Sequence, residues 1–355
     1  MRPAPGYFIR PARTADLDGL LAMSRLAGPG FTSLQPDPDF LMAMIAKSEA
    51  SFARPVAGTS HSFLLVMETD REGELVGCAS VKTGVGSDAF MCADFEALGE
   101  GSTIRTLKLR RTLQGCTEVG SLFLHPDHRA SGAGRFLARA RYMLMATRPD
   151  LFAEPIVAQL RGWCDQAGRS PFYDAVWLER LGQTYTQTDI RLAREGAGFL
   201  IERFDGLEVH LADLYADAAR TIGEPHDAAR GALRLLCQEG FEISRLIDLS
   251  DGGPITKARL DKLSCIQQAH PVELARARDE DEAPVGLVSS QNFDTFTAFT
   301  GPIGLKDGQA FLPQTALSKF REHAGTQVLA SPSRPLHATP TTDQEQCHSK
   351  KSATA

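Results

Sequence analysis

The feature that most constrains the fold is a strand, a turn and a helix that follow one another in the middle of the chain. Residues 118–124 form a short apolar run typical of a buried strand, and residues 132–147 place apolar side chains on one side of a helix. Between them, the sequence Arg-x-x-Gly-x-Gly opens the helix. Amides at a helix start point one way and carry partial positive charge, so this loop is predicted to capture an anion.

The residues expected to hold this anion are Arg129, Gly132, Ala133, Gly134 and Arg135. The glycines let a phosphate approach the backbone, and the two arginines add positive charge at both ends of the loop. Gly-x-Gly alone is weak evidence, because a merely flexible helix start has the same sequence. The loop lacks the third glycine of the dinucleotide fingerprint and the lysine of a P-loop. The strand and the Pro-Asp-x-Arg turn before it favour anion binding.

Composition and charge narrow the class of protein. The chain has 355 residues, and its 43% hydrophobic and 23% charged residues are typical of a soluble globular protein with two or three domains. A net charge of −6 argues against a broad basic face for nucleic acid. No apolar run is long enough to span a bilayer, and the first residues lack a signal-peptide core. We expect neither a nucleic-acid nor a membrane partner.

The cysteines predict the compartment and argue against a metal. Seven cysteines are scattered along the chain and no CxxC pair occurs. This pattern argues against a zinc site and a disulfide framework and favours a reducing cytoplasm, so we expect no metal and a cytoplasmic location. Nothing near Cys116 in sequence would lower the pKa of its thiol, which argues against a covalent acyl-enzyme.

The rest of the chain is predicted to be mixed α/β. Residues 84–115 show a weak pattern with many glycines, residues 275–283 are a charge run expected to be a solvated linker, and the tail from 332 has too few apolar residues to order itself. The further strands are expected at 7–11, 62–67, 75–81, 155–160, 241–249, 285–289, 293–299 and 326–329, and the helices from Thr14 and at 39–51, 171–181, 211–221 and 228–239.

These features resemble a known family. The glycine loop resembles the coenzyme A pyrophosphate loop of the GCN5-related acyltransferase superfamily, and residues 8–17 with the hairpin at 63–81 resemble its first strand, first helix and central strands. A closer resemblance, from about residue 8 to about 330, is to the arginine N-succinyltransferase family. It is carried by six segments in the family's order: 30–34, 121–124, Arg161-Gly162 with 170–172, 222–226, 239–241 and 251–254.

The resemblance implies a fold class. We expect an α/β (α+β) chain with a GCN5-related N-acyltransferase-like mixed sheet flanked by helices, a second α/β portion and a small C-terminal β-barrel-like domain. The expected boundaries are 1–196 for the acyl-CoA-binding domain, 197–274 for the second portion, 284–331 for the β domain and 332–355 for a disordered tail.

The resemblance also implies a reaction. It would transfer succinyl from succinyl-CoA, a co-substrate rather than a tightly bound cofactor, to the α-amino group of L-arginine in arginine catabolism. His226, which follows Ile-Gly-Glu-Pro at a loop-to-helix junction, would be the catalytic proton-transfer residue. The main chain at Leu122 and Leu124 would meet the acyl-CoA, and the glycine loop would bind its pyrophosphate. Two-subunit arrangements in the family suggest a homo- or hetero-oligomer.

Two alternatives remain open at the level of sequence. The family's aromatic-rich stretch is replaced by residues 89–94, its Gly-Gly-Gly is replaced by residues 28–30, and residues 183–210 match poorly. These departures allow ornithine or another amine as the acceptor. A non-catalytic subunit that only binds acyl-CoA is the second alternative. His125 and His128, although close to the loop, are expected to be turn residues without a catalytic role.

Overall fold

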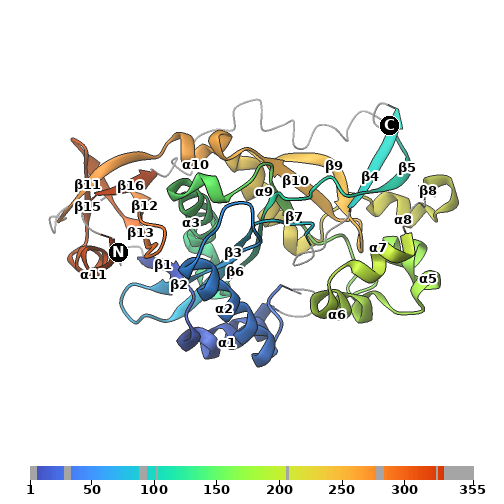
Figure 1. Ribbon diagram of the computed structural model, residues 1–355, viewed down its shortest axis with the longest axis horizontal. Helices are drawn as coiled ribbons and strands as arrows, with labels where there is room; N and C mark the ends of the chain where they lie inside the picture. Colours follow the sequence, from blue (N-terminus) through green and yellow to red (C-terminus); the bar gives the residue numbers. More distant parts are fainter. Residues whose placement is uncertain are drawn as a thin grey trace. The chain divides into compact units, whose positions relative to one another are not determined.

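The computed structural model describes residues 6–27, 33–87, 94–100, 103–204, 208–276, 284–324 and 327–331. The chain divides into two compact units, and each combines separate stretches of sequence (Figure 1). The first contains Met1–Thr83, Val119–Ala153 and Leu260–Leu336, and the second contains Gly84–Glu118, Glu154–Arg259 and His337–Ala355. The predicted coenzyme loop therefore lies in the first unit and His226 in the second. Residues 28–30, most of the stretch 89–94, residues 277–283 of the charge run and the predicted tail lie outside the described residues.

The strands of the first unit form a mixed sheet in the order β14-β15-β11-β16-β12-β13-β1-β2-β3-β6. Strand β1 pairs antiparallel with both β2 and β13, whereas β11 and β15 are parallel. The chain's first strand is thus central in this sheet, although its two partners come from distant parts of the sequence. The strands are β1 (Tyr7–Pro11), β2 (Ser62–Thr69), β3 (Leu75–Lys82), β6 (Thr117–Leu124), β11 (His270–Arg276), β12 (Val285–Ser290), β13 (Ala298–Pro302), β14 (Gly304–Lys306), β15 (Gln309–Leu312) and β16 (Gln327–Ser331).

Helices pack on both faces of this sheet. Cys78 on β3 lies in one apolar cluster with residues of α1 and α2, whereas a Cβ atom added to the neighbouring Gly77 would lie 2.9 Å from Leu137 of α3. Successive strand residues point to opposite faces, so α3 covers the face opposite to α1 and α2. Asp37 begins α2 by accepting the amides of the first turn. The helices are α1 (Leu17–Ala27), α2 (Pro38–Ala53), α3 (Ala133–Thr147), α10 (Ser264–Gln267) and α11 (Gln314–Ala324).

The second unit has its own strand order, β7-β10-β9-β4-β5-β8, and the first residues of β6 run parallel to β7. Its apolar core centres on Trp177, whose indole N–H donates to the Leu249 carbonyl at 2.8 Å, and on Phe95 and Phe172. The elements are β4 (Asp94–Glu100), β5 (Thr103–Arg110), β7 (Ile156–Gln159), β8 (Glu208–His210), β9 (Glu242–Asp248), β10 (Pro254–Ala258), α4 (Pro171–Tyr173), α5 (Glu179–Leu181), α6 (Tyr185–Glu195), α7 (Gly198–Phe204), α8 (Ala216–Thr221) and α9 (Arg230–Glu239).

The mixed α/β class predicted from the sequence is confirmed, although some local predictions differ. The helix predicted over 211–221 is interrupted, because a 3-10 turn covers Leu211–Asp213 and α8 begins only at Ala216. The weak pattern at 84–115 conceals a long antiparallel hairpin, β4–β5, whose strands mix buried and polar residues. The strand predicted over 293–299 is wrong in its first part. Asn292 there forms a turn by accepting the Asp294 amide at 3.1 Å, and β13 begins only at Ala298.

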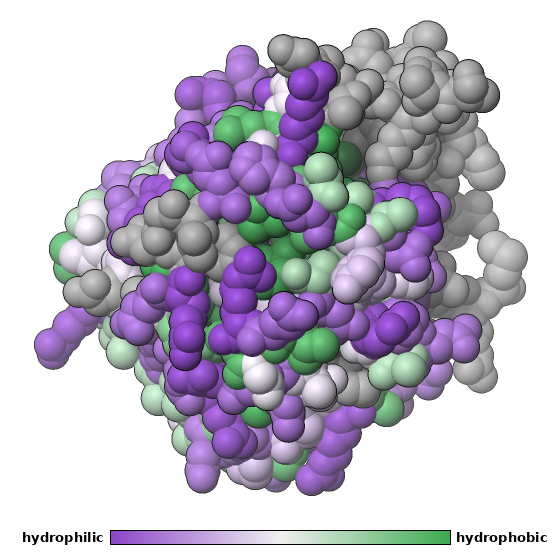
Figure 2. All heavy atoms as spheres, turned by 90° about the vertical axis from the view of Figure 1, so that its right-hand side faces the viewer, coloured by the Kyte–Doolittle hydropathy of each residue, from purple (hydrophilic) through white to green (hydrophobic). Residues whose placement is uncertain are grey.

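The molecular surface is mainly hydrophilic on the face shown in Figure 2, where apolar side chains show through between polar ones near its centre. Exposed large apolar side chains of the second unit include Leu178, Ile190, Tyr215 and Ile243. Isolated apolar side chains of this kind are ordinary on folded proteins. Within the described part of the chain, every helix is too short or too polar to cross a membrane.

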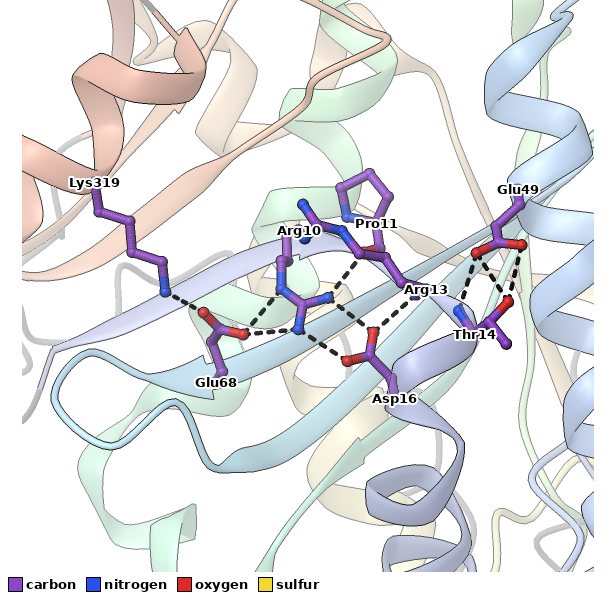
Figure 3. Close-up of polar contacts among 8 residues, drawn as sticks. All are labelled: Arg10, Pro11, Arg13, Thr14, Asp16, Glu49, Glu68 and Lys319. Carbon is purple, nitrogen blue, oxygen red and sulfur yellow. Dashed lines mark hydrogen bonds and ion pairs between the residues drawn. The ribbon is translucent and has the colours of Figure 1, made fainter.

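A network of buried charges joins the two ends of the first unit's sequence (Figure 3). The Arg10 guanidinium on β1 donates to both carboxylate oxygens of Asp16 at 2.8 and 2.9 Å, and its Nε donates to Glu68 of β2 at 2.9 Å. Lys319 of α11 contacts the other oxygen of Glu68. Only 16% of the Arg10 side chain is exposed. Arg10 therefore pairs with both carboxylates, and it shares Glu68 with Lys319.

Replacing Arg10 with alanine is expected to lower the free energy of unfolding by about 3 kcal/mol, because the buried Asp16 loses its ion pair and Glu68 is left with Lys319. Burial raises the pKa of Asp16, but hydrogen bonds from Arg10 and from the Arg13 amide outweigh burial and lower that pKa. The stability that the pair contributes is therefore present above the ordinary carboxyl pKa and disappears as the pH falls through the lowered value. Urea unfolding of both proteins at pH 7 measures the loss of unfolding free energy, and the same comparison at about pH 3 measures how much of that difference disappears in acid.

The control is Arg148→Ala, which removes an exposed pair with Asp150 in the same unit. It should change the unfolding curve little. Equal unfolding curves for the two variants would show that the buried Arg10 network contributes no more to stability than an exposed ion pair does.

Candidate active site

The predicted coenzyme loop is held against the central strands of the first unit. Strand β6 ends at Leu124, and the His125 amide donates to the Val76 carbonyl of β3 at 2.7 Å. A 3-10 turn leads to Gly132, whose φ of 76° lies in the left-handed region that favours glycine, and α3 begins directly after it. The Arg135 amide donates to the Gly132 carbonyl at 3.1 Å. An amide that meets an anion here must therefore precede Arg135.

The side chains of the loop leave the helix start open. A Cβ atom added at Gly132 would meet no atom within 4 Å, and one at Gly134 would meet only Leu124, at 3.6 Å. Packing within the chain would therefore accept a side chain at Gly134. Arg129 folds back onto the strand, where its Nε donates to the Leu124 carbonyl at 3.1 Å. Ala133 is buried and Arg135 half-buried.

The strand before the loop is irregular where Leu122 lies. Ser121 has a φ of 50°, which is rare for a residue with a side chain and costs about 1–2 kcal/mol. Its hydroxyl accepts a hydrogen bond from Ser80 at 2.9 Å, and its carbonyl accepts one from the Cys78 thiol at 3.5 Å. Leu122, which is half-buried, directly follows this irregular residue in β6.

The two histidines of the loop make local contacts. His128 Nδ1 is hydrogen-bonded to the Tyr7 hydroxyl at 2.9 Å, which attaches the loop to β1. His125 Nδ1 accepts the Asp127 amide at 3.3 Å and caps the 3-10 turn. These contacts support the prediction that both are turn residues.

His226, in the second unit, lies at the entrance to α9. It caps the short 3-10 turn Asp227–Ala229, and its Nδ1 accepts the Ala228 amide at 3.1 Å. Because that lone pair is occupied, the neutral ring carries its proton on Nε2. Burial and then the positive charge of Arg161 lower the pKa of His226, and Asp227 opposes them. His226 is therefore a neutral imidazole whose Nε2–H is a donor.

Three loops hold His226 in place, namely residues 160–163, 222–226 and 250–254. The His226 amide donates to the Arg161 carbonyl at 2.8 Å, and the Trp163 amide donates to the Glu224 carbonyl at 3.0 Å. Between them, Gly162 and Pro225 form an antiparallel bridge. The Gly223 amide donates to Gly252 at 2.8 Å. The backbone around His226 is thus fixed by segments that are far apart in sequence.

Buried groups surround these loops. Asp251 accepts hydrogen bonds from the Gly162 amide and from the Tyr185 hydroxyl, at 2.8 and 3.0 Å. Burial, and next the neighbouring Asp248, raise the pKa of Asp251 to about 7. Burial raises the pKa of Asp189 to about 6, although Arg161 opposes the shift. The surroundings of His226 therefore contain carboxyl groups that titrate near neutral pH.

Comparison with known proteins decides the family. A family model described as "Arginine N-succinyltransferase beta subunit" matches residues 7–265, which is most of the chain. The chain belongs to the arginine N-succinyltransferase beta subunit family. "Arginine N-succinyltransferase subunit beta" of Pseudomonas aeruginosa is 28% identical over 332 residues, which cover 91% of this chain and 97% of that protein. "Arginine N-succinyltransferase" of Photorhabdus laumondii is 27% identical over 329 residues, 90% and 96% of the two chains.

A solved structure agrees with this assignment. The protein described as arginine/ornithine succinyltransferase subunit AI from Pseudomonas aeruginosa superposes with a TM-score of 0.81 at 26% identity, over 92% of this chain and 99% of that one. The family resemblance predicted from the sequence is therefore confirmed, and with it the enzyme class, because arginine N-succinyltransferases are acyltransferases.

Other chemistries find little support in the described residues. Among these, no group of three or more His, Cys, Asp or Glu side chains is arranged to hold a metal ion. Burial, followed by the nearby Glu118 and Asp94, raises the pKa of the Cys116 thiol to about 12. Cys116 is therefore not a thiolate at neutral pH, which agrees with the prediction that set aside a covalent acyl-enzyme.

Sequence reasoning missed the residues that hold His226 in this family member. The sequence places Asp251 only in the family-like segment 251–254, and Tyr185 lies in the stretch 183–210, which matches the family poorly. The available signal was the pair of glycines after Asp251, since adjacent glycines often mark a close approach of another backbone. A Cβ atom at Gly253 would lie 2.0 Å from the Leu160 carbonyl oxygen. A Cβ atom at Gly162 would lie 2.3 Å from the main-chain carbonyl oxygen of Asp251.

Replacing Gly162 with alanine is expected to destabilise the second unit by about 1–3 kcal/mol, since two backbones must move apart. The change should also lower turnover, because the neighbours of Gly162 hold His226. The matched control is Gly231→Ala in α9, where an added Cβ meets nothing within 4 Å and stability should rise by about 0.5–1 kcal/mol. Thermal unfolding compares the two. A Gly162→Ala variant as stable as the Gly231→Ala variant would contradict this packing argument.

Proposed function

We propose that this chain transfers the succinyl group of succinyl-CoA to the α-amino group of L-arginine, as the entry step of arginine catabolism. The observation that carries the proposal is the family match over most of the chain, with relatives named for this reaction. Transfer is direct. The amine nitrogen attacks the thioester carbonyl carbon, the C–S bond breaks, and the amine loses one proton while the thiolate gains one. Succinyl-CoA is a substrate, and no tightly bound cofactor is needed.

We assign coenzyme binding to the first unit, with β1–β3, β6 and α1–α3 as its GCN5-related core. The amides of Ala133 and Gly134 at the start of α3 would meet the pyrophosphate, with Arg129 and Arg135 supplying positive charge. The open space at Gly132 and Gly134 supports this assignment, because packing does not demand a glycine at 134. The main chain at Leu122, which follows the irregular Ser121, and the strand end at Leu124 would meet the acyl arm.

His226 is assigned to the chemical step. Its Nε2–H would donate to the charge that develops on the thioester carbonyl oxygen or on the leaving sulfur. A neutral donor suits this role because the Ala228 amide occupies Nδ1, so the ring is not set up to accept a second proton there. The free thiols among the described cysteines agree with the proposed cytoplasmic location.

Replacing His226 with alanine is expected to reduce kcat by about 10²–10³-fold, the usual loss when one donor to a developing charge is removed. KM for succinyl-CoA should stay within about twofold, because the coenzyme loop is untouched. Release of free coenzyme A thiol in the presence of arginine measures both. His210→Ala, at an exposed histidine of the same unit, is the control. Unchanged turnover in the His226→Ala variant would remove this residue from the reaction.

Replacing Arg135 with alanine is expected to raise KM for succinyl-CoA about tenfold and to leave kcat nearly unchanged, since a charge-assisted contact to phosphate is lost. Calorimetric titration with coenzyme A gives the same comparison without turnover. The control is Arg148→Ala at the opposite end of α3. If both variants bind the coenzyme as the unmutated chain does, the pyrophosphate lies elsewhere.

The description of the solved relative gives one specific reason to consider a second acceptor. It names both arginine and ornithine for that protein. Thiol release from succinyl-CoA with arginine, ornithine and other amines ranks the acceptors. Fast turnover of ornithine beside slow turnover of arginine would replace L-arginine in the proposal.

The subunit names of the relatives motivate a proposal on assembly. "Subunit beta" and "subunit AI" describe those proteins as parts of larger enzymes. We infer that this chain works as a homo- or hetero-oligomer. Light scattering of the purified chain, together with the turnover assay, separates the possibilities. A chain that binds succinyl-CoA but shows no turnover alone would favour the non-catalytic, acyl-CoA-binding subunit.

A further inference from the structure

We propose that Asp251 is the positioning residue for His226. Its carboxylate holds the Gly162 amide, and the two neighbours of Gly162 hold the loop that carries His226. The inference rests on the proposed function, in which His226 serves acyl transfer, and it adds a residue to which sequence reasoning gave no role.

The Asp251 carboxylate is fully engaged. Only 5% of the residue is exposed, and both oxygens accept hydrogen bonds. One oxygen accepts the Gly162 amide at 2.8 Å and the Tyr185 hydroxyl at 3.0 Å, and the other accepts the Gly253 amide at 2.9 Å. All three partners are donors. A carboxylate suits this place better than an amide side chain, because the NH2 group of asparagine would face at least one N–H donor.

A short path of backbone contacts leads from Asp251 to His226. Gly162 lies between Arg161, whose carbonyl accepts the His226 amide at 2.8 Å, and Trp163, whose amide donates to Glu224 at 3.0 Å. When Asp251 fixes Gly162, it fixes both of these contacts. The imidazole itself is oriented by the Ala228 amide. The position of the ring therefore depends on a carboxylate that does not touch it.

Stability alone does not account for Asp251. A buried carboxyl group whose pKa is raised favours its protonated form, so its charge costs stability as the pH rises through that pKa. The charged and titratable groups around it are Asp248 from β9, Tyr185 from α6 and Cys164. Of these, Asp248 adds to the cost. A group that is costly to keep ionised and that fixes a candidate catalytic loop is more easily explained by positioning than by stability.

The test is Asp251→Asn in the full-length chain. We expect kcat to fall at least tenfold, KM for succinyl-CoA to stay within about twofold, and the melting temperature at pH 8 to change by a few degrees at most. The matched control is Asp165→Asn, which alters a carboxylate that accepts backbone amides close to Gly162 in sequence but does not hold it. Tyr185→Phe removes one donor and leaves the Gly162 contact, so a smaller loss is expected.

A double-mutant cycle separates positioning from other roles. In the His226→Ala background, Asp251→Asn should lower residual turnover no further, because the residue it positions is gone. A further fall by the full factor would overturn the proposal. So would unchanged kcat in the single Asp251→Asn variant, or loss of turnover matched by loss of folding in both Asp251→Asn and Tyr185→Phe.

A measurement that does not depend on turnover separates the test of Asp251 from the test of the proposed function. Ring-nitrogen NMR should show the Nε2–H tautomer of His226 in the unmutated chain and a mixture of tautomers in Asp251→Asn. If His226→Ala retains full turnover, the proposed role of His226 fails, yet the tautomer comparison still decides whether Asp251 positions the ring. Identical tautomers in the two proteins would refute positioning.

Discussion

Two backbones of the second unit approach each other so closely that only glycine fits between them. Gly162 and Gly253 lie where an added Cβ would fall 2.3 and 2.0 Å from carbonyl oxygens of the opposite segment. At that separation the segments share hydrogen bonds, and a third loop, which ends in His226, pairs with the same stretch. The position of His226 thus depends on the absence of a Cβ atom at Gly162 and Gly253 as much as on the hydrogen bonds of the surrounding residues.

The two halves of the proposed reaction are built in different ways. The coenzyme loop is contiguous, because β6, the turn and α3 follow each other in the sequence. Its open helix start arises from Gly132 and the first turn of α3, which directly follows. The setting of His226 is assembled from segments separated by tens of residues. The Gly162 and Asp251 contact joins positions 89 residues apart. Local sequence can encode the first arrangement, whereas the second exists only when the unit has folded.

This difference explains what the sequence could predict. The hairpin β2–β3, helix α3 and the glycine loop were predicted because their apolar periodicity and turn residues are local. The hairpin β4–β5 was missed because Glu96, Lys108 and other polar residues interrupt its apolar pattern, and its pairing depends on contacts to β8 and β9. His226 was found through family resemblance. Asp251 was not, since nothing adjacent to it in sequence shows that its carboxylate would be buried beneath Gly162 and Tyr185.

The electrostatics of His226 limit what it can do in acyl transfer. Burial and then the positive charge of Arg161 lower the pKa of His226, Asp227 opposes them, and the Ala228 amide separately occupies the Nδ1 lone pair. A ring in this setting stays neutral near pH 7 and offers one polarised N–H at Nε2. Such a group stabilises negative charge as it forms and does not need to change its own charge during the reaction. The proton lost by the amine is then not required to pass through His226, and the reaction can be direct with a single well-placed donor. The geometry around Asp251 matters for this reason, since a fixed dipole is effective only while its direction is held.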